Sequence, residues 1–284
     1  MQRTCARFLR LALLALAITA CASEGKDPAT PASDPTPQSE TAAISAAVSA
    51  AVDAPDRSAE DRALDAGRQP ARVLAFFGIE PGMRVAELGA GGGYTTELLV
   101  RVVGPTGRVY GQNSPFLLKR VAEAPWSARL AKPVMKGVVR LDRDFDDPFP
   151  PDVRDLDAVL MILLYHDTVW MKVDRERMNR AVYAALKPGG VYGIVDHSAR
   201  VGTGLADVES LHRIDESKLR SEVEAAGFRL AADADFLHNP QDTRDWSPSP
   251  RVAGERRGTS DRFVLRFTRP AVTASVVNDE RGSP

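Results

Sequence analysis

Residues 85–93 read Val-Ala-Glu-Leu-Gly-Ala-Gly-Gly-Gly, an apolar segment that runs directly into a glycine-rich loop. A short buried strand is expected over Met83–Leu88, because the apolar run is brief and follows a Pro-Gly turn. The loop, Gly89–Gly93, is expected to lead into a helix that ends near Val103. Glycines let the backbone turn sharply and let a ligand approach it closely, while Glu87 supplies a carboxylate at the strand end.

The sequence on either side of this motif alternates strands and helices. Such alternation is typical of a parallel sheet covered by helices. The continuous apolar run Leu156–Leu164 is typical of a strand that is buried on both faces. Further strands are expected at 109–111, 138–141, 191–195, 228–236 and 262–267, with one helix holding Met178, Val182 and Leu186 and another running from an Asp215 N-cap to Gly227.

The glycine loop disfavours a dinucleotide-binding function. A G-x-G-x-x-G fingerprint that starts at Gly89 would require glycine at the position of Tyr94. The segment instead fits the pattern E/D-x-G-x-G-x-G at all four fixed positions, which are Glu87, Gly89, Gly91 and Gly93. In this it resembles motif I of the class I S-adenosylmethionine-dependent methyltransferases.

Other stretches extend the resemblance over nearly all of the expected globular part. Leu186-Lys187-Pro188-Gly189-Gly190 resembles the turn before the fifth strand of that superfamily. Tyr165-His166-Asp167, Asp196-His197-Ser198 and residues 211–216 resemble a family of exported bacterial predicted methyltransferases. The resemblance implies an α/β fold with a Rossmann-like, doubly wound, seven-stranded sheet, mostly parallel with an antiparallel final strand and with helices on both faces. It also implies methyl transfer from S-adenosylmethionine.

The resemblance assigns cofactor-binding residues to three strand ends. Glu87 would bind the ammonium side of the cofactor, and the helix after Gly93 would face the cofactor carboxylate. The superfamily usually has an acidic residue for the ribose after the second strand, but here amides stand there, so Asn113 is carried forward with Gln112 as a substitute. The full expected set is Glu87, Gly89, Ala90, Gly91, Gly93, Asn113, Asp144 and Phe145, with Asp142 and Asp146 as alternatives to Asp144 for the adenine amine.

Two histidine–aspartate pairs follow the fourth and fifth strands. Because neighbouring parallel strands end at the same edge of a sheet, His166 with Asp167 and Asp196 with His197 are expected to converge. Methyl transfer needs alignment of donor and acceptor, and removal of a proton when the acceptor is a hydroxyl. His166 is the expected base, oriented by Asp196 or Asp167, and Tyr165 would position substrate or lie over the sulfonium.

Other functions fit parts of the same pattern. The two histidine–aspartate pairs could chelate a divalent metal, but no metal is expected, since a Mg²⁺ site would prefer more oxygen ligands and no imidazole. His212 lies where lid or substrate residues would be expected, whereas Asp215 is expected to be a helix cap. A noncatalytic module that binds an adenosyl ligand in the same pocket stays open, as does a metal-dependent hydrolase on this fold.

The N-terminal segment has the pattern of an export signal. Three arginines precede an apolar run too short to span a bilayer, and Ile18-Thr19-Ala20-Cys21 resembles the lipobox of bacterial lipoproteins. The expected organisation is a signal peptide at 1–20, a disordered tether at 21–55, the methyltransferase-like domain at 56–270 and a disordered tail at 271–284. The resemblance predicts a periplasmic lipoprotein anchored to a membrane through lipidated Cys21.

Composition limits the partners. The 284 residues carry 37 Lys+Arg and 38 Asp+Glu, so no overall positive charge attracts nucleic acid. Both cysteines, Cys5 and Cys21, lie in the N-terminal segment, which excludes a disulfide or a cysteine nucleophile in the expected domain. The expected substrate is a small molecule or a component of the cell envelope.

Overall fold

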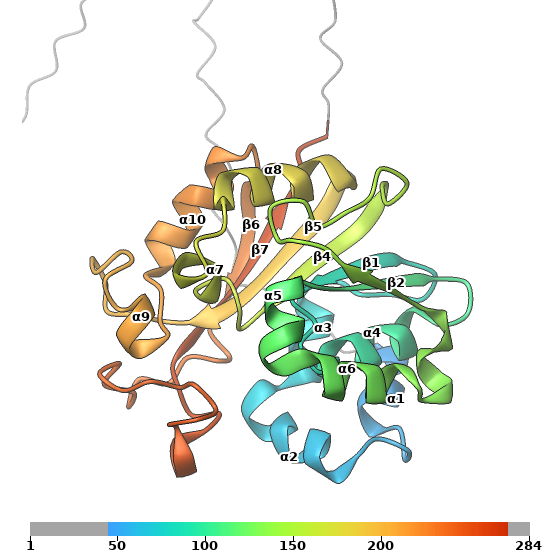
Figure 1. Cartoon of the computed structure of the whole chain (residues 1–284), viewed down its shortest axis with the longest axis horizontal. Coiled ribbons are helices and arrows are strands. Elements are labelled where there is room, and N and C mark those ends of the chain that lie inside the picture. Colours follow the sequence, from blue (N-terminus) through green and yellow to red (C-terminus); the bar gives the residue numbers. More distant parts are fainter. Residues whose placement is uncertain (1–44, 272–284) are drawn as a thin grey trace, which may run out of the picture. The chain divides into compact units, whose positions relative to one another are not determined.

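The computed structural model describes residues 45–271, which contain one seven-stranded sheet (Figure 1). The strand order is β3-β2-β1-β4-β5-β7-β6. Strands β1 to β5 are mutually parallel, while β7 is antiparallel to both of its neighbours. The strands are β1 (Arg84–Leu88), β2 (Arg108–Asn113), β3 (Val138–Asp142), β4 (Leu156–Ile162), β5 (Leu186–His197), β6 (Arg229–Ala234) and β7 (Arg262–Thr268).

Helices cover both faces of the sheet, as the sequence predicts. Successive strand residues point to opposite faces, so Val85 packs in one hydrophobic cluster and Ala86 in the other. Figure 1 shows α8 and α10 on one side and α3, α4 and α6 on the other. The helices are α1 (Ala46–Asp53), α2 (Ala59–Arg68), α3 (Pro70–Phe76), α4 (Tyr94–Val103), α5 (Pro115–Leu117), α6 (Glu123–Leu130), α7 (Asp167–Trp170), α8 (Arg175–Ala185), α9 (Val208–Leu211) and α10 (Glu216–Ala225), with a π turn at Leu118–Ala122 and 3₁₀ turns at Pro133–Gly137 and Gly254–Arg256.

The folded region begins before Asp56, the predicted start of the domain. Ser45 caps α1 by accepting a hydrogen bond from the Val48 backbone N–H at 3.3 Å. Val48 is fully buried and Ala51 is 3% exposed, both in the cluster that also contains residues of α3 and α4. The prediction of a tether up to residue 55 is therefore wrong for α1, because a small apolar face on an alanine-rich helix is enough to dock it. Residues 21–44 of the predicted tether, the signal peptide and all but the first residue of the predicted tail lie outside the described residues.

Two other boundaries differ from the prediction. The Lys-Pro-Gly-Gly segment belongs to β5 rather than to a turn before it, because the Gly189 N–H donates to the Arg269 carbonyl at 2.7 Å and the Arg269 N–H donates to the Gly190 carbonyl at 2.9 Å. Strand β4 ends at Ile162, since Leu163 adopts a left-handed φ of 57°. Within residues 45–271, no helix has the length and apolar character needed to cross a membrane.

Candidate functional site

The glycines of the loop between β1 and α4 are needed for different structural reasons. Gly89, Gly91 and Gly93 all have positive φ, at 68°, 56° and 80°. A Cβ at Gly89 would lie 1.7 Å from Leu164 Cδ2, and one at Gly93 would lie 2.6 Å from Trp126 Cζ3. A Cβ at Gly91 would meet nothing within 4 Å. Packing therefore requires glycine at the first and third positions, whereas Gly91 borders open space in which a ligand can lie against the backbone.

Glu87, the penultimate residue of β1, lies against the first turn of α4. Its side chain accepts a hydrogen bond from Thr96 Oγ1, and the residue is 3% exposed. Burial raises the pKa of Glu87 to about 7, although the hydroxyls of Thr96 and Thr95 and the charge of Arg68 oppose the shift. A cation that comes close to this carboxyl would favour its ionised form.

Two amides at the end of β2 hold the glycine loop. Gln112 Oε1 accepts from the Gly89 N–H at 3.0 Å. Asn113 Oδ1 accepts from the Gly91 N–H at 2.8 Å, and its Nδ2 donates to the Gly91 carbonyl at 3.1 Å. An amide can donate and accept at once, which a carboxylate cannot, so it matches a peptide group on both sides. The expectation that Asn113 is available for ribose hydroxyls is not supported, because both of its polar atoms are bonded to the loop.

The two residues expected near the adenine differ in accessibility. Asp144 is exposed after the end of β3. Phe145 is 2% exposed and lies next to the loop, since a Cβ on Gly89 would be 3.5 Å from its Cε1. Phe145 thus supports the base of the loop, while Asp144 is free to meet a ligand from solvent. Ala90 lies in the loop, and its backbone N–H donates to the Gln112 carbonyl at 2.8 Å.

The predicted convergence of the histidine–aspartate pairs is found at the ends of β4 and β5. Asp196, fully buried, accepts from the His166 backbone N–H at 2.7 Å and lies 2.7 Å from His166 Nδ1. His166 Nε2 lies 3.1 Å from Asp167 Oδ1. Burial alone would lower the pKa of His166, but the two carboxylates outweigh burial and raise this pKa to about 10. The two carboxylates therefore favour the protonated form of His166, which weighs against its expected role as the base; that role stays a prediction.

His197 has the opposite electrostatic environment. Its Nδ1 lies 2.8 Å from Ser260 Oγ, and its ring centroid is 5.6 Å from that of His166. Burial and the positive charge of His166 lower the pKa of His197 well below its ordinary value. The lowered pKa keeps the His197 imidazole neutral, so it can accept a proton, although as a weaker base than a free imidazole; Nε2 is the nitrogen that remains for a ligand.

Asp167 contacts a third histidine, His212, for which the sequence predicted only a place in a lid or substrate region. Its Oδ1 accepts from Trp170 Nε1 at 2.7 Å and lies 3.2 Å from His212 Nδ1. The hydrogen bonds from His166, His212 and Trp170 outweigh burial and hold the pKa of Asp167 far below its usual range. His212 reaches this position because α9 ends there, and its proximity to Asp167 is a long-range contact that no local pattern signals.

Tyr165 does not belong to the cluster. Its hydroxyl donates to Glu222 Oε2 at 3.0 Å and accepts from Asn179 Nδ2 at 2.9 Å. Glu222 and Asn179 lie on α10 and α8, so the Tyr165 ring packs into the layer behind the sheet. This orientation weighs against the predicted contact with substrate or sulfonium, because the Tyr165 ring is fully buried and its hydroxyl is already hydrogen-bonded on that side.

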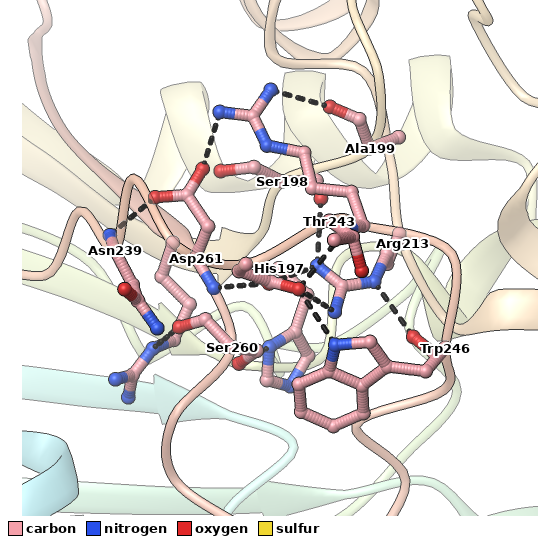
Figure 2. Close-up of polar contacts among 12 residues, drawn as sticks. His197, Ser198, Ala199, Arg213, Asn239, Thr243, Trp246, Ser260 and Asp261 are labelled. Carbon is pink, nitrogen blue, oxygen red and sulfur yellow. Dashed lines mark hydrogen bonds and ion pairs between the residues drawn. The ribbon is translucent and has the colours of Figure 1, made fainter. Parts of the chain in front are cut away.

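A buried polar network fixes the segments on either side of His197 and His212 (Figure 2). Arg213 is fully buried, pairs with Asp242 at 2.8 Å and donates to the carbonyls of Trp246 at 2.9 Å and Ser198 at 3.0 Å. Sequence reasoning missed this network, since Arg213 and Asp242 are far apart in the chain. It ties the end of β5, the His212 segment and the loop before β7 into one rigid unit.

A small, apolar pocket of about 20 Å³ lies between α3, the start of α4 and the ends of β4 and β5. Two arginines line it among side chains such as Leu98 and Ile162. Arg68 stacks over the Tyr94 ring at 4.4 Å, and Arg262 donates to the carbonyls of Ser260, Gly67 and Gly258. Burial and the neighbouring Arg68 lower the pKa of Arg262 to about 10.

Known proteins resemble this chain in fold and in the region of the glycine loop. The family model of protein-L-isoaspartate(D-aspartate) O-methyltransferases matches residues 39–124. The protein-L-isoaspartate O-methyltransferase of Methanothermobacter thermautotrophicus is 33% identical over 51 residues, so the match spans 18% of this chain and only 24% of that relative.

Solved structures extend the likeness over most of the chain. An S-adenosylmethionine-dependent methyltransferase from Aquifex aeolicus superposes with a TM-score of 0.51 at 18% identity, over 73% of this chain and 96% of the other. A putative sarcosine dimethylglycine methyltransferase from Galdieria sulphuraria gives 0.52 at 17% identity, over 82% and 94%. The chain thus has the fold of the class I S-adenosylmethionine-dependent methyltransferases, with the expected mostly parallel seven-stranded sheet and antiparallel final strand.

Proposed function

We propose that this protein binds S-adenosylmethionine and transfers its methyl group to a small molecule or to a component of the cell envelope. The observation that carries the proposal is the open space at Gly91, in a loop that fits motif I at every fixed position. The family match at 39–124 supports it, because this range contains β1, the loop and β2. The match leaves out most of the acceptor side, so an isoaspartyl acceptor is not carried over.

The cofactor's charges fit the surroundings of the loop. Its ammonium group would favour the ionised form of Glu87, and its carboxylate would be stabilised by Arg68 at the pocket wall. Asp144 is the candidate partner of the adenine amine. Gly91 would let the backbone approach the cofactor, with the ribose near Gly91 rather than on the Asn113 amide.

The acceptor would lie at the ends of β4 and β5. His197 Nε2 is our candidate for the group that removes a proton from an acceptor hydroxyl, and Ser260 orients its ring through Nδ1. Asp196 holds both histidines, since it also accepts from the His197 backbone N–H at 2.8 Å. In this assignment His166 and Asp167 shape the acceptor site instead of supplying the base.

Titration calorimetry of the full chain with S-adenosylmethionine and its demethylated product tests the binding step. We expect a dissociation constant in the micromolar range, about −8 kcal/mol, and at least a tenfold loss in Gly91→Ala. Gly78→Ala is the matched control, since Gly78 also has positive φ and a Cβ there would meet no atom within 4 Å. No binding to the unaltered chain, or equal losses in both variants, would contradict the proposal.

A second candidate is a noncatalytic module that binds an adenosyl ligand. The Asn113 amide, which is bonded to the loop where an acid usually holds the ribose, favours it. Transfer of a labelled methyl group from S-adenosylmethionine to an envelope fraction separates the two functions. Loss of transfer in His197→Gln, with calorimetric binding retained, identifies an enzyme; binding without any transfer to small-molecule or envelope fractions favours the module.

We also propose that the protein is exported and anchored as a periplasmic lipoprotein, as in the exported family whose motifs it resembles. The lipobox sequence at Ile18–Cys21 supports this proposal. Fractionation and mass spectrometry of the mature N-terminus would find a lipidated Cys21 in the membrane fraction. Release of Cys21→Ser into the soluble periplasm is expected, and an unprocessed cytoplasmic chain would contradict the proposal.

A further inference from the structure

Three side chains at the ends of β4 and α9 are arranged as a set of metal ligands. We propose that His166, Asp167 and His212 bind one divalent transition-metal ion. One ligand atom from each lies within 4.8 Å of the others. The separations from Asp167 Oδ1 are 3.1 Å to His166 Nε2 and 3.2 Å to His212 Nδ1. Metal bonds of about 2.0–2.1 Å in a tetrahedral site place neighbouring ligand atoms about 3.3 Å apart, so two of the three edges already fit.

The outer contacts of these side chains are those that orient metal ligands. A ligating histidine almost always gives its other ring N–H to a carboxylate or carbonyl, which fixes its tautomer. His166 does this through Nδ1, 2.7 Å from the fully buried Asp196. Asp167 is held in turn by Trp170 Nε1 at 2.7 Å. Two of the three ligands therefore have their orientation fixed by neighbours outside the set.

The facing atoms call for a cation between them. Without a metal, the protonated form of His166 has a proton on Nε2 that bridges to Asp167 Oδ1; a metal ion would displace this proton, and Nε2 would then offer its lone pair while Nδ1 still donates to Asp196. Two lone pairs at 3.1 Å repel each other unless a proton or a metal ion lies between them. A metal ion satisfies Nε2, Asp167 and His212 together, whereas a single proton bridges only one pair.

His212 adopts an unfavourable backbone conformation. Its φ of 49° lies in the left-handed region, which is unfavourable for a residue with a side chain and is often found at functional sites. Arg213, next to it, is anchored by the buried network (Figure 2), and the Ile214 N–H donates to the His197 carbonyl at 3.0 Å. The side chains of His212 and Asp167 are 31% and 20% exposed, so an ion can enter and keep a position open for a ligand.

The donor atoms select the class of ion. Two imidazoles and one carboxylate suit Zn²⁺, Co²⁺, Fe²⁺ or Ni²⁺, whereas Mg²⁺ and Ca²⁺ prefer sites made of oxygen. This site differs from the expectation of no metal, which was based on the two strand-end pairs without His212. Metal binding goes beyond the proposed methyl transfer and is measured independently of it.

Titration of the full chain with Co²⁺ tests the site. The protein is made without a histidine tag, freed of metal by chelator and dialysis, and followed by the visible absorption of bound Co²⁺; Zn²⁺ is then added to displace it. We expect one equivalent to bind, no displacement by excess Mg²⁺, and at least a tenfold weaker affinity in His212→Gln and Asp167→Asn. Asp196→Asn, which changes only the outer contact, is expected to weaken binding by about 10- to 100-fold.

His238→Gln is the matched control, because His238 also pairs with an aspartate, Asp261, at 2.9 Å but lies outside the set. It should bind Co²⁺ as the unaltered chain does. Circular dichroism and thermal melting establish that each variant is folded, and His212→Gln remains informative should His166→Gln fail to fold. Absence of a tight equivalent in the unaltered chain, or equal affinity in His212→Gln and His238→Gln, would overturn the proposal whatever the outcome with S-adenosylmethionine.

Discussion

At the residue scale, Glu87 links the stability of the fold to its ligand. Its pKa is raised from 4.5 to about 7 by burial, so between these values the folded chain binds more protons than the unfolded chain. The contribution of Glu87 to stability is therefore expected to fall as pH rises through this window, by up to about 3 kcal/mol, and to be constant above it. Urea unfolding from pH 4.5 to 8 should show this fall as the difference between the unaltered chain and Glu87→Gln, which share the titration of His166 and His197.

The control variant, Thr96→Val, retains the carboxyl group of Glu87. Thr96→Val removes the hydroxyl that donates to Glu87 and should steepen the fall with pH, because the ionised form loses a hydrogen bond. S-adenosylmethionine should flatten the fall, since its ammonium group favours the ionised carboxyl. An identical pH profile in Glu87→Gln and the unaltered chain would show that this carboxyl is not the titrating group.

Residue-level prediction from the sequence succeeded where local geometry controls position. His166, Asp167, Asp196 and His197 follow two neighbouring strands, so the topology brings them together. Their protonation could not be predicted, because it depends on which carboxylate faces which ring nitrogen. The sequence also could not place Tyr165 in the rear layer, since a single residue after a strand end decides which side its side chain takes.

At the element scale, the most local signals gave the most accurate boundaries. The helix predicted to end near Val103 is α4, and the predicted N-cap Asp215 caps α10 by accepting from the Ser217 N–H at 2.9 Å. Asp215 also accepts from the Gly202 N–H at 2.6 Å, so it joins α10 to the loop after β5. The start of β5 and the pairing of Gly189 and Gly190 with Arg269 depend on distant residues and were not predictable from local patterns.

Asp215 therefore supports two elements at once. We expect Asp215→Ala to lower the free energy of unfolding by about 1–2 kcal/mol. Asp215→Asn should retain most of the stabilisation from the cap, because an amide oxygen can still accept a hydrogen bond. Urea unfolding measures the difference. Asp235→Ala, at an exposed position after β6, is the control and should change stability by less than about 0.5 kcal/mol. Equal stability of the two alanine variants would mean that the cap contributes nothing to the fold.

At the scale of the whole molecule, the folded domain includes α1, which composition alone assigned to a tether. Val48 is fully buried against the cluster that covers one face of the sheet, whereas Val252 is 67% exposed. Removing two buried methyl groups in Val48→Ala should cost about 1–3 kcal/mol, or several degrees in melting temperature for a domain of this size. Val252→Ala removes the same atoms from an exposed position and should have almost no effect. Equal melting temperatures for the two variants would mean that α1 does not contribute to the stability of the domain. A single cooperative transition that is lowered only in Val48→Ala would show that α1 is part of the domain that carries the glycine loop. This outcome is expected because α1 packs on α4, the helix that follows the loop.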